Sequence, residues 1–278
     1  MAGVSTKEIK NRIRSMESTR QITKAMEMVA ASKLRRTQAQ VLAARPYFET
    51  LRTTIDEIMA SNRDFSSVYL QQRPVSKAVC IVIAGDRGLA GGYNSNVLKK
   101  ALEWVQKQDT VVLPIGKKAV EFFKLHGVTL LTENHAEAAA VSLGDCFSIA
   151  KKLCGQFGNG TFDSVSVIYT DFVSVLAQEP RELSLLPLAG PAEPCMEKDV
   201  LYEPDSKTVF DAIIPEYLGG VLYGALCESR ASEQAARRTA MDNATQNAEE
   251  MIGQLSLQFN RARQAAITGE IIDIIAGS

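Results

Sequence analysis

The sequence has few of the residues that build disulfide frameworks and metal centres. Its 278 residues include only five cysteines and two histidines. The cysteines are odd in number and scattered, and neither His126 nor His135 has a cysteine or histidine at a ligand spacing. We therefore expect a chain that folds in a reducing compartment without disulfides, metal or another cofactor.

A long apolar run and a strong net charge are also missing. No apolar run of about 20 residues occurs, and the first residues form no apolar signal core. The net charge of −1 gives no general attraction to nucleic acid. We expect no obvious secretion signal and no membrane span, although such a chain can still sit on a membrane complex.

Charge is nevertheless uneven along the chain. Residues 1–40 carry nine lysines and arginines against three glutamates, a net charge of +6. Basic helices of this kind bind nucleic acid or anionic lipid, or they present a solvated face beside a coiled-coil seam. Because glutamates alternate with the basic residues around an apolar seam, the solvated face is favoured over nucleic acid. A third reading is that this positive face meets acidic loops of a partner.

Proline is absent from long stretches near both ends, and glycine is absent from the first of them. Neither residue occurs between residues 4 and 45, and Pro215 is the last proline. The first stretch predicts a helix of about 40 residues, spanning roughly 60 Å, and leaves open a continuation past a kink at Pro46 toward Met59. A helix of that length does not fit inside a compact domain.

Apolar residues at heptad-like spacing predict that the two terminal helices pair. The expected seam of the second helix is Met241, Ala244, Ala248, Met251, Leu255, Phe259, Ala262 and Ala266. That of the first is Ile9, Ile13 and Met16, followed after a slip by Ile22, Met26 and Val29. With a domain between them, the simplest pairing is antiparallel. The second helix is longer, so its tip should project alone and leave its isoleucines without cover from the same chain: Ile271, Ile272, Ile274 and Ile275.

The middle of the chain alternates between short apolar runs and helical stretches. Strands are expected at 77–85, 110–116, 127–131, 162–172 and 181–188. Helices are expected near 94–107, 117–125 and 142–157. This alternation predicts a Rossmann-like α/β domain with a parallel-type sheet. The expected division is 1–62 for the first coiled-coil helix, 70–205 for the α/β domain and 206–278 for the second helix.

A catalytic site is not evident in this middle domain. The segment "AGDRGLAGGYNSN" (84–96) lies between a strand and a helix, where phosphate-binding loops occur, but its spacing is not GxGxxG. "GKK" (116–118) lacks the hydroxyl that would hold magnesium. We favour a structural turn in which Asp86 and Arg87 pair locally, and we expect no catalytic residues.

Five segments give the chain a close family resemblance. They are "ITKAMEMVAASKLRR" (22–36), "DRGLAGGYNSN" (86–96), "LYEPD" (201–205), "SEQAARRTAMDNATQNAEEMI" (232–252) and "NRARQAAITGEIIDII" (260–275). Together they resemble the gamma subunit of F-type ATP synthase, and the resemblance covers essentially the whole chain.

The resemblance implies a non-catalytic rotor subunit of the central stalk. It implies a shaft inside a ring of alpha and beta subunits, and a foot that meets the c-subunit ring and the epsilon subunit. The isoleucine tip would run in an apolar sleeve of the alpha–beta ring. The resemblance also implies a peripheral membrane protein, which we expect on the cytoplasmic face of a bacterial inner membrane.

The resemblance and the chemistry of the side chains mark candidate contact residues. Candidates for contacts to the alpha–beta ring that depend on the rotor angle are Lys24, Met26, Arg263, Gln264 and Glu270. Candidates for the face toward the c ring and epsilon are Tyr202, Glu203 and Asp205. Each has a plainer alternative: seam packing for Met26, a solvated helix face for Arg263 and Gln264, and a surface turn for the last three.

The sequence departs from the family pattern at two positions, and two other functions compete with the rotor role. Ala90 stands where many family members carry cysteine, and Gly269 replaces a longer polar residue before Glu270, which puts a contact at that position in doubt. We expect no thiol switching, because no inserted redox-cysteine segment is present. The rivals are a static coiled-coil tether with an adaptor domain and a nucleotide-binding enzyme built on the middle domain.

Overall fold

The computed structural model describes residues 6–61, 67–188 and 202–277. Contacts between residues group the chain into two compact units. Unit 1 consists of residues 1–32 and 237–278, and unit 2 consists of residues 33–236. The predicted three-part division at 1–62, 70–205 and 206–278 follows element type and stays a prediction.

Two long helices dominate the chain, as predicted. Helix α1 runs from Thr6 to Ser61 and helix α5 from Ser206 to Ala276, so they contain 56 and 71 residues. At 1.5 Å per residue these correspond to about 84 Å and about 107 Å. Pro46 lies inside α1, so the helix does continue past it.

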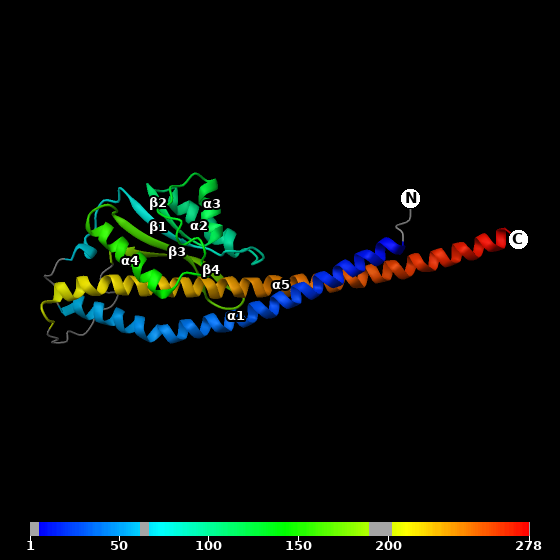
Figure 1. Cartoon of the computed structure of the whole chain (residues 1–278), viewed down its shortest axis with the longest axis horizontal. Helices are drawn as coiled ribbons and strands as arrows, with labels where there is room; N and C mark the ends of the chain where they lie inside the picture. The colour runs from blue at the N-terminus through cyan, green and yellow to red at the C-terminus, as the bar shows by residue number, and fades with distance from the viewer. Residues whose placement is uncertain (1–5, 62–66, 189–201, 278) are drawn as a thin grey trace. The chain divides into compact units, whose positions relative to one another are not determined.

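Unit 2 contains a four-stranded sheet in the order β2-β1-β3-β4 (Figure 1). The strands are β1 (Ala78–Ile83), β2 (Thr110–Ile115), β3 (Ser164–Phe172) and β4 (Gln178–Leu186). Strand β1 pairs in parallel with both β2 and β3, whereas β4 returns antiparallel along β3. The sheet is therefore mixed, since its last strand arrives by a hairpin rather than by a helical crossover.

The strand expected at 127–131 does not form. Only one bridge joins this segment to the sheet, between Val112 and Leu130. Gly127, the first residue of this segment, has a left-handed backbone conformation with φ +66°. Farther along the chain, the carbonyl of His135 accepts a hydrogen bond from Gly116 N, just after β2, at 3.1 Å. Segment 127–131 therefore pairs with β2 at a single residue, and the chain after it crosses the carboxyl end of β2.

Strand β1 reads "AVCIVI" without alternation because both of its faces are buried. Val79, Ile81 and Ile83 belong to a core cluster that includes α4 (Leu143–Gly158), the start of α5 and the end of α1. The residues between them, including Cys80 and Val82, face α2 (Tyr93–Val105) and α3 (Lys117–Leu125). Helices thus cover the sheet on both sides, as a Rossmann-like fold requires.

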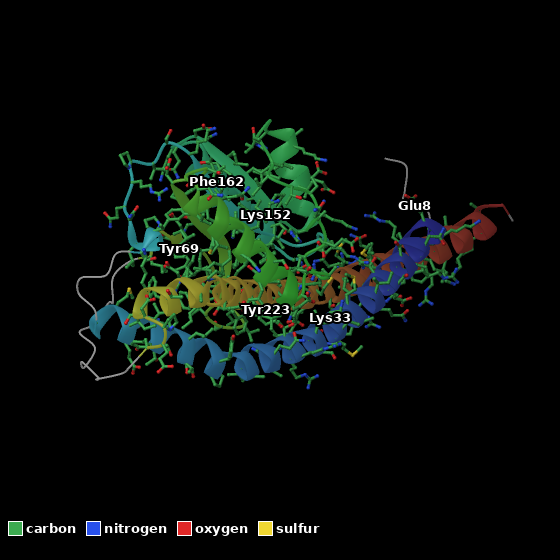
Figure 2. The ribbon with its side chains drawn as sticks, turned by 60° about the vertical axis from the view of Figure 1, so that its left-hand side comes forward. Glu8, Lys33, Tyr69, Lys152, Phe162 and Tyr223 are labelled. Carbon is green, nitrogen blue, oxygen red and sulfur yellow. The ribbon has the colours of Figure 1, made fainter. Side chains whose placement is uncertain are left out.

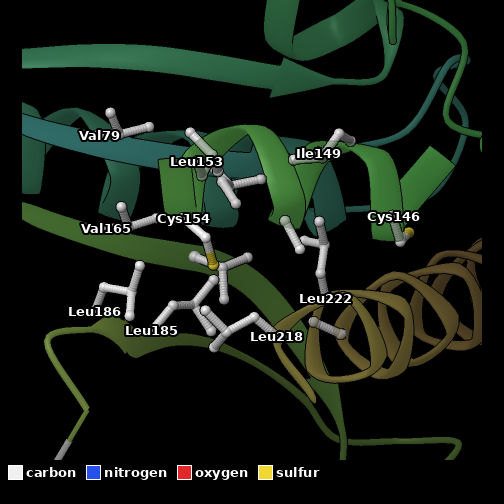
Figure 3. Packing of buried hydrophobic residues seen from close by; sticks show 14 of the residues in the cluster. Val79, Cys146, Ile149, Leu153, Cys154, Val165, Leu185, Leu186, Leu218 and Leu222 are labelled. Carbon is white, nitrogen blue, oxygen red and sulfur yellow. The ribbon is translucent and has the colours of Figure 1, made fainter. Parts of the chain in front are cut away.

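The contact between α4 and α5 is close (Figure 3). Leu153 of α4 and Leu218 and Leu222 of α5 lie together over the sheet. At Gly219 an added Cβ would lie 2.2 Å from Cδ1 of Phe147, so only glycine allows this approach. On the same core cluster, the rings of Tyr69 in the 3-10 turn η1 (Val68–Leu70) and Phe157 stack at 6.5 Å (Figure 2 labels Tyr69).

Helix α5 contains one stretch long and apolar enough by composition to cross a bilayer, with a mean hydropathy of 1.3. That stretch is 44% buried in the structure. Phe210, Ile214 and Leu226 of α5 are fully buried in the core of unit 2. This pattern is typical of the core helix of a globular domain, where apolar composition serves packing.

Candidate functional site

In unit 1 the two long helices pack in opposite directions. The hydroxyls of Thr23 and Thr245 are 2.7 Å apart and buried. Toward the start of α1, Arg20 Nη1 lies 3.8 Å from Glu249 Oε1, farther along α5. Residue numbers therefore rise along one helix as they fall along the other, which confirms the predicted antiparallel pair.

The seam on α1 repeats every seven residues without a slip. Its members at this spacing are Ile9, Met16, Thr23 and Ala30, and the predicted Ile13 is half-buried, as Met16 is. The predicted seam residues Ile22 and Val29 are instead 58% and 54% exposed, so that prediction was wrong. A strict seven-residue repeat includes Thr23, whose hydroxyl hydrogen-bonds to that of Thr245 between the helices. A search restricted to apolar residues selects the neighbouring Ile22 instead.

The seam on α5 matches the expectation more closely. The predicted residues Met241, Ala248 and Leu255 are buried, and Thr245 joins them. Met251 is 42% exposed and does not belong to the seam. Alanines bring the two helices close together, which places the two threonine hydroxyls within hydrogen-bonding reach.

The far end of α5 is exposed. Since Thr23 lies opposite Thr245, Thr6 at the start of α1 lies opposite about residue 262 of α5. Ala262 is half-buried, and every residue from 263 to 268 is exposed. Beyond them Ile271, Ile272 and Ile275 are 51%, 58% and 72% exposed. The side chain of Ile274 lies outside the described part of the structure.

Lys24 is exposed and lines the rim of a groove between α1 and α5. Its Nζ is 2.8 Å from Glu27 Oε2 on the same helix. This hydrogen bond and the charge of Glu27 raise the pKa of Lys24, so the ammonium stays charged. Met26 is half-buried, which fits its alternative role in packing.

The other candidate coupling residues lie beyond the paired part of α5. Arg263 and Gln264 are exposed, and the backbone carbonyl of Gln264 accepts a hydrogen bond from Thr268 Oγ1 at 2.9 Å. The side chain of Glu270 is not among those described. A Cβ added at Gly269 would meet no atom within 4 Å, so packing does not demand a glycine there.

The foot candidates lie where α5 begins in unit 2. Tyr202 packs against the large core cluster, and Glu203 is exposed. Asp205 caps the helix, because its Oδ1 accepts from Thr208 N at 2.9 Å and its Oδ2 from Thr208 Oγ1 at 2.7 Å. These hydrogen bonds lower the pKa of Asp205. A helix cap is the structural role of this carboxylate; contact with a partner stays a prediction.

The glycine-rich segment 84–96 forms the turn between β1 and α2. Gly85 N donates to Asn94 Oδ1 at 2.8 Å, which links the two ends of the turn. The carboxylate of Asp86 accepts hydrogen bonds from backbone amides of Lys117, Ala138 and Ala139. These amides were not foreseen as its partners, because their residues follow it by 31 to 53 positions.

Thiols and metal ligands form no cluster among the residues that the structure describes. Four cysteines there are free and buried, and burial raises the pKa of Cys146 and Cys154 to about 12. No group of three or more His, Cys, Asp or Glu side chains gathers in the same residues. Cys195 lies outside the described ranges.

The arrangement in unit 1 suits contact with other polypeptides rather than chemistry on a small molecule. It offers a paired helical rod, a basic solvent face on α1 and an exposed apolar end. Figure 2 shows charged side chains along α1, among them the labelled Glu8 and Lys33, both exposed.

Sequence comparisons find relatives over nearly the whole chain. Residues 5–278 match a family model described as ATP synthase. A protein named ATP synthase gamma chain from Ruminococcus albus is 45% identical, over 98% of this chain and 97% of the relative. One of the same name from Heliobacterium modesticaldum is 42% identical, with the same coverage.

Solved structures support the fold. A chain in the rotor of Euglena gracilis mitochondrial ATP synthase aligns with a TM-score of 0.64 at 21% identity, covering 94% of this chain and 98% of that one. A second chain, from a structure of the OSCP, F1 and c-ring parts of the same enzyme, aligns with a TM-score of 0.67 at 20% identity. It covers 98% of this chain and 93% of that one.

Proposed function

We propose that the helix pair of this chain, which belongs to the gamma chain family of non-catalytic ATP synthase subunits, transmits torque as the rotor shaft. The observation that carries the proposal is the exposed apolar end of α5. Ile271, Ile272 and Ile275 are half to three-quarters exposed, although isoleucine is among the residues most often fully buried.

The free energy gained by burying these isoleucines favours a surrounding protein surface at the end of α5. Fully burying one isoleucine side chain is worth about 1.5–3 kcal/mol, so covering three half-exposed ones contributes roughly 3–5 kcal/mol. Hydrophobic burial has no preferred direction. An apolar end can therefore be held at the centre of the alpha–beta ring while it turns, and Ile274 belongs to the same bearing.

Directional contacts must then mark the rotor angle. Charged hydrogen bonds are short and oriented, so they hold only at certain angles. We assign this role to Lys24, Arg263 and Glu270, and to Gln264 as a neutral hydrogen-bonding partner, while Met26 beside Lys24 contributes a packing contact to the same coupling surface. Lys24 has to share its ammonium between Glu27 and a carboxylate of the ring, which is feasible because the side chain is 54% exposed.

The foot completes the path of the torque. Tyr202, Glu203 and Asp205 are assigned to the face toward the c ring and the epsilon subunit. Tyr202 packs, half-buried, against the core cluster of unit 2, which gives force applied at this segment a path to the sheet and α5. We also propose that the subunit is a peripheral protein on the cytoplasmic face of a bacterial inner membrane, held there through the c ring, and its similarity to bacterial gamma chains supports this location.

Crosslinking separates a rotor from a static tether. Gln264→Cys, an exposed position, is paired with a cysteine placed in the ring-facing part of a beta subunit, and ATP-driven proton pumping is measured in vesicles. We expect the crosslink to abolish pumping and reduction to restore it, with the reduced variant as the control. Pumping that persists through a complete crosslink contradicts rotation and favours the tether.

Assembly tests the apolar bearing. The triple variant I271S/I272S/I275S should leave the helicity and thermal unfolding of the free chain unchanged, because these side chains are exposed there. Its co-purification with alpha, beta and epsilon subunits should fall. The matched control is Gln258→Ser, an exposed position on the same helix. A triple variant that assembles and pumps like the parent chain contradicts the bearing.

A further inference from the structure

The turn after β1 and the start of α3 meet at one edge of the sheet. Strands β1 and β2 are parallel neighbours, so the segments that follow them leave from the same edge. In doubly wound folds this edge is where phosphates and other anions bind. In this chain the side-chain carboxylate of Asp86 occupies this edge.

The carboxylate of Asp86 fills a ring of backbone donors at this edge. Its Oδ1 accepts from Lys117 N at 3.2 Å and from Ala138 N at 2.8 Å. Its Oδ2 accepts from Ala139 N at 3.0 Å. Lys117 is the first residue of α3, and Ala138 and Ala139 are consecutive, so a helix start and two successive amides converge on one anion.

The segment that supplies two of these amides is fixed from its other side by α5. Arg230 donates from Nε to the carbonyl of Ala138 at 3.1 Å and from Nη2 to the carbonyl of Val141 at 2.7 Å. The amides of this segment therefore point at Asp86 while its carbonyls face a guanidinium. Ala138 is only 4% exposed, so its amide and carbonyl are shielded from water, whereas Ala139 is exposed.

The backbone around Asp86 is packed closely. Gly116 has φ +103°, and a Cβ there would lie 2.1 Å from the carbonyl oxygen of Ala84. Lys118 N donates to Gly85 O at 3.1 Å across the same gap. The turn after β1 thus lies directly against the start of α3, with Asp86 half-buried beside it.

We propose that Asp86 is a resident anion: its carboxylate occupies a backbone anion site at the carboxyl edge of the sheet, holds segment 136–141 in place and keeps soluble anions out. Asp86 is a positioning residue in this account. Removing the carboxylate leaves three amides aimed at a vacant site, which small carboxylates and phosphate can enter. The proposal does not depend on rotation or on the bearing.

The test is chemical rescue of Asp86→Ala in the full-length chain. Thermal unfolding is followed by circular dichroism while sodium phosphate or acetate is raised at constant ionic strength. We expect the variant to melt several degrees below the parent chain and to regain most of that loss along a saturable curve. The parent and Asp109→Ala, which removes an exposed carboxylate elsewhere in unit 2, should show no saturable response.

A purely structural role for Asp86 gives a different result. A folded Asp86→Ala variant with no saturable gain from either anion overturns the proposal, as does a parent chain that responds equally. If the variant folds poorly, its refolding yield should rise saturably with phosphate, and a flat yield also overturns the proposal. In Asp86→Asn the amide side chain occupies the space of the carboxylate, so this variant should be destabilised and added anions should not restore it. Restoration of Asp86→Asn by phosphate or acetate would contradict the proposal that anions enter the space left by the carboxylate.

Discussion

The buried hydroxyl pair of Thr23 and Thr245 gives the sharpest quantitative prediction. The two Oγ1 atoms are 2.7 Å apart, and the residues are 8% and 6% exposed. Thr245 Oγ1 also lies 2.8 Å from the carbonyl of Met241. Each hydroxyl supplies one hydrogen, so both are satisfied when Thr245 donates to Met241 and Thr23 donates to Thr245.

Valine has nearly the shape of threonine and removes only the hydroxyl. Each single variant, Thr23→Val or Thr245→Val, leaves one hydroxyl facing a methyl group in the seam, which should cost about 1 kcal/mol. The cost stays modest because the remaining hydroxyl can bond a carbonyl of its own helix, that of Arg20 or Met241. The double variant removes both hydroxyls and should unfold within about 0.5 kcal/mol of the parent chain.

The assay is a double-mutant cycle on the full-length chain, with urea unfolding followed by circular dichroism at 222 nm, a wavelength sensitive to helix. We expect a coupling energy of about 1.5 kcal/mol between the two sites, which is the two single costs of about 1 kcal/mol less the double cost of about 0.5 kcal/mol. Thr19→Val serves as the control, because Thr19 is exposed on the same helix and bonds only to the carbonyl of Ser15 in the structure's described contacts. Additive costs, with the double variant equal to the sum of the singles, would refute the reasoning.

The consequence for the helix pair is its register. A slide of one helix past the other would move Thr23 away from Thr245 and leave both hydroxyls in an apolar seam. Buried polar residues in coiled coils fix register in this way at a cost in stability. The double valine variant should therefore keep its stability while allowing alternative registers, which cysteine pairs placed along the two helices can detect.

Three further predictions concern the glycines and the carboxylates. Gly219→Ala should destabilise the chain by about 1–3 kcal/mol, because its Cβ would overlap the ring of Phe147; thermal unfolding measures the loss, and an unchanged melting temperature contradicts the close contact. Gly269→Ala is the matched opposite case: with no atom within 4 Å of the new Cβ, it should increase helix stability by about 0.5–1 kcal/mol, visible as higher helicity on heating. Asp145, in the first turn of α4, accepts hydrogen bonds from Ser142 N and Oγ, both at 2.7 Å. Hydrogen bonds lower the pKa of Asp145 and Asp205 in the folded chain, so their stabilisation is present above about pH 4 and is lost as the pH falls through their lowered values. Asn substitutions at both should flatten the fall in urea midpoint on acidification, and an unaltered pH profile would contradict this.

The sequence alone determined most of the elements and the family. A stretch without proline or glycine at residues 4–45 predicted the first terminal helix, and the absence of proline after Pro215 predicted the second, because proline is the residue that interrupts helical hydrogen bonds most strongly. Short apolar runs predicted β1, β2 and β3, since strands covered on both faces need no polar residues. The resemblance of five segments identified the family, and the contact roles assigned to Lys24, Arg263 and Gln264 still rest on it.

Only the tertiary structure decided which side chains meet. The segment 127–131 is apolar enough for a strand, but its pairing ends after one residue because the chain turns over the end of β2. Thr23 was left out of the predicted seam, and the structure buries its hydroxyl against that of a second threonine 222 positions away. Asp86 found its donors 31 to 53 residues downstream. A polar side chain carries no periodic signal of burial, because its place inside a protein depends on a partner that only the fold brings near.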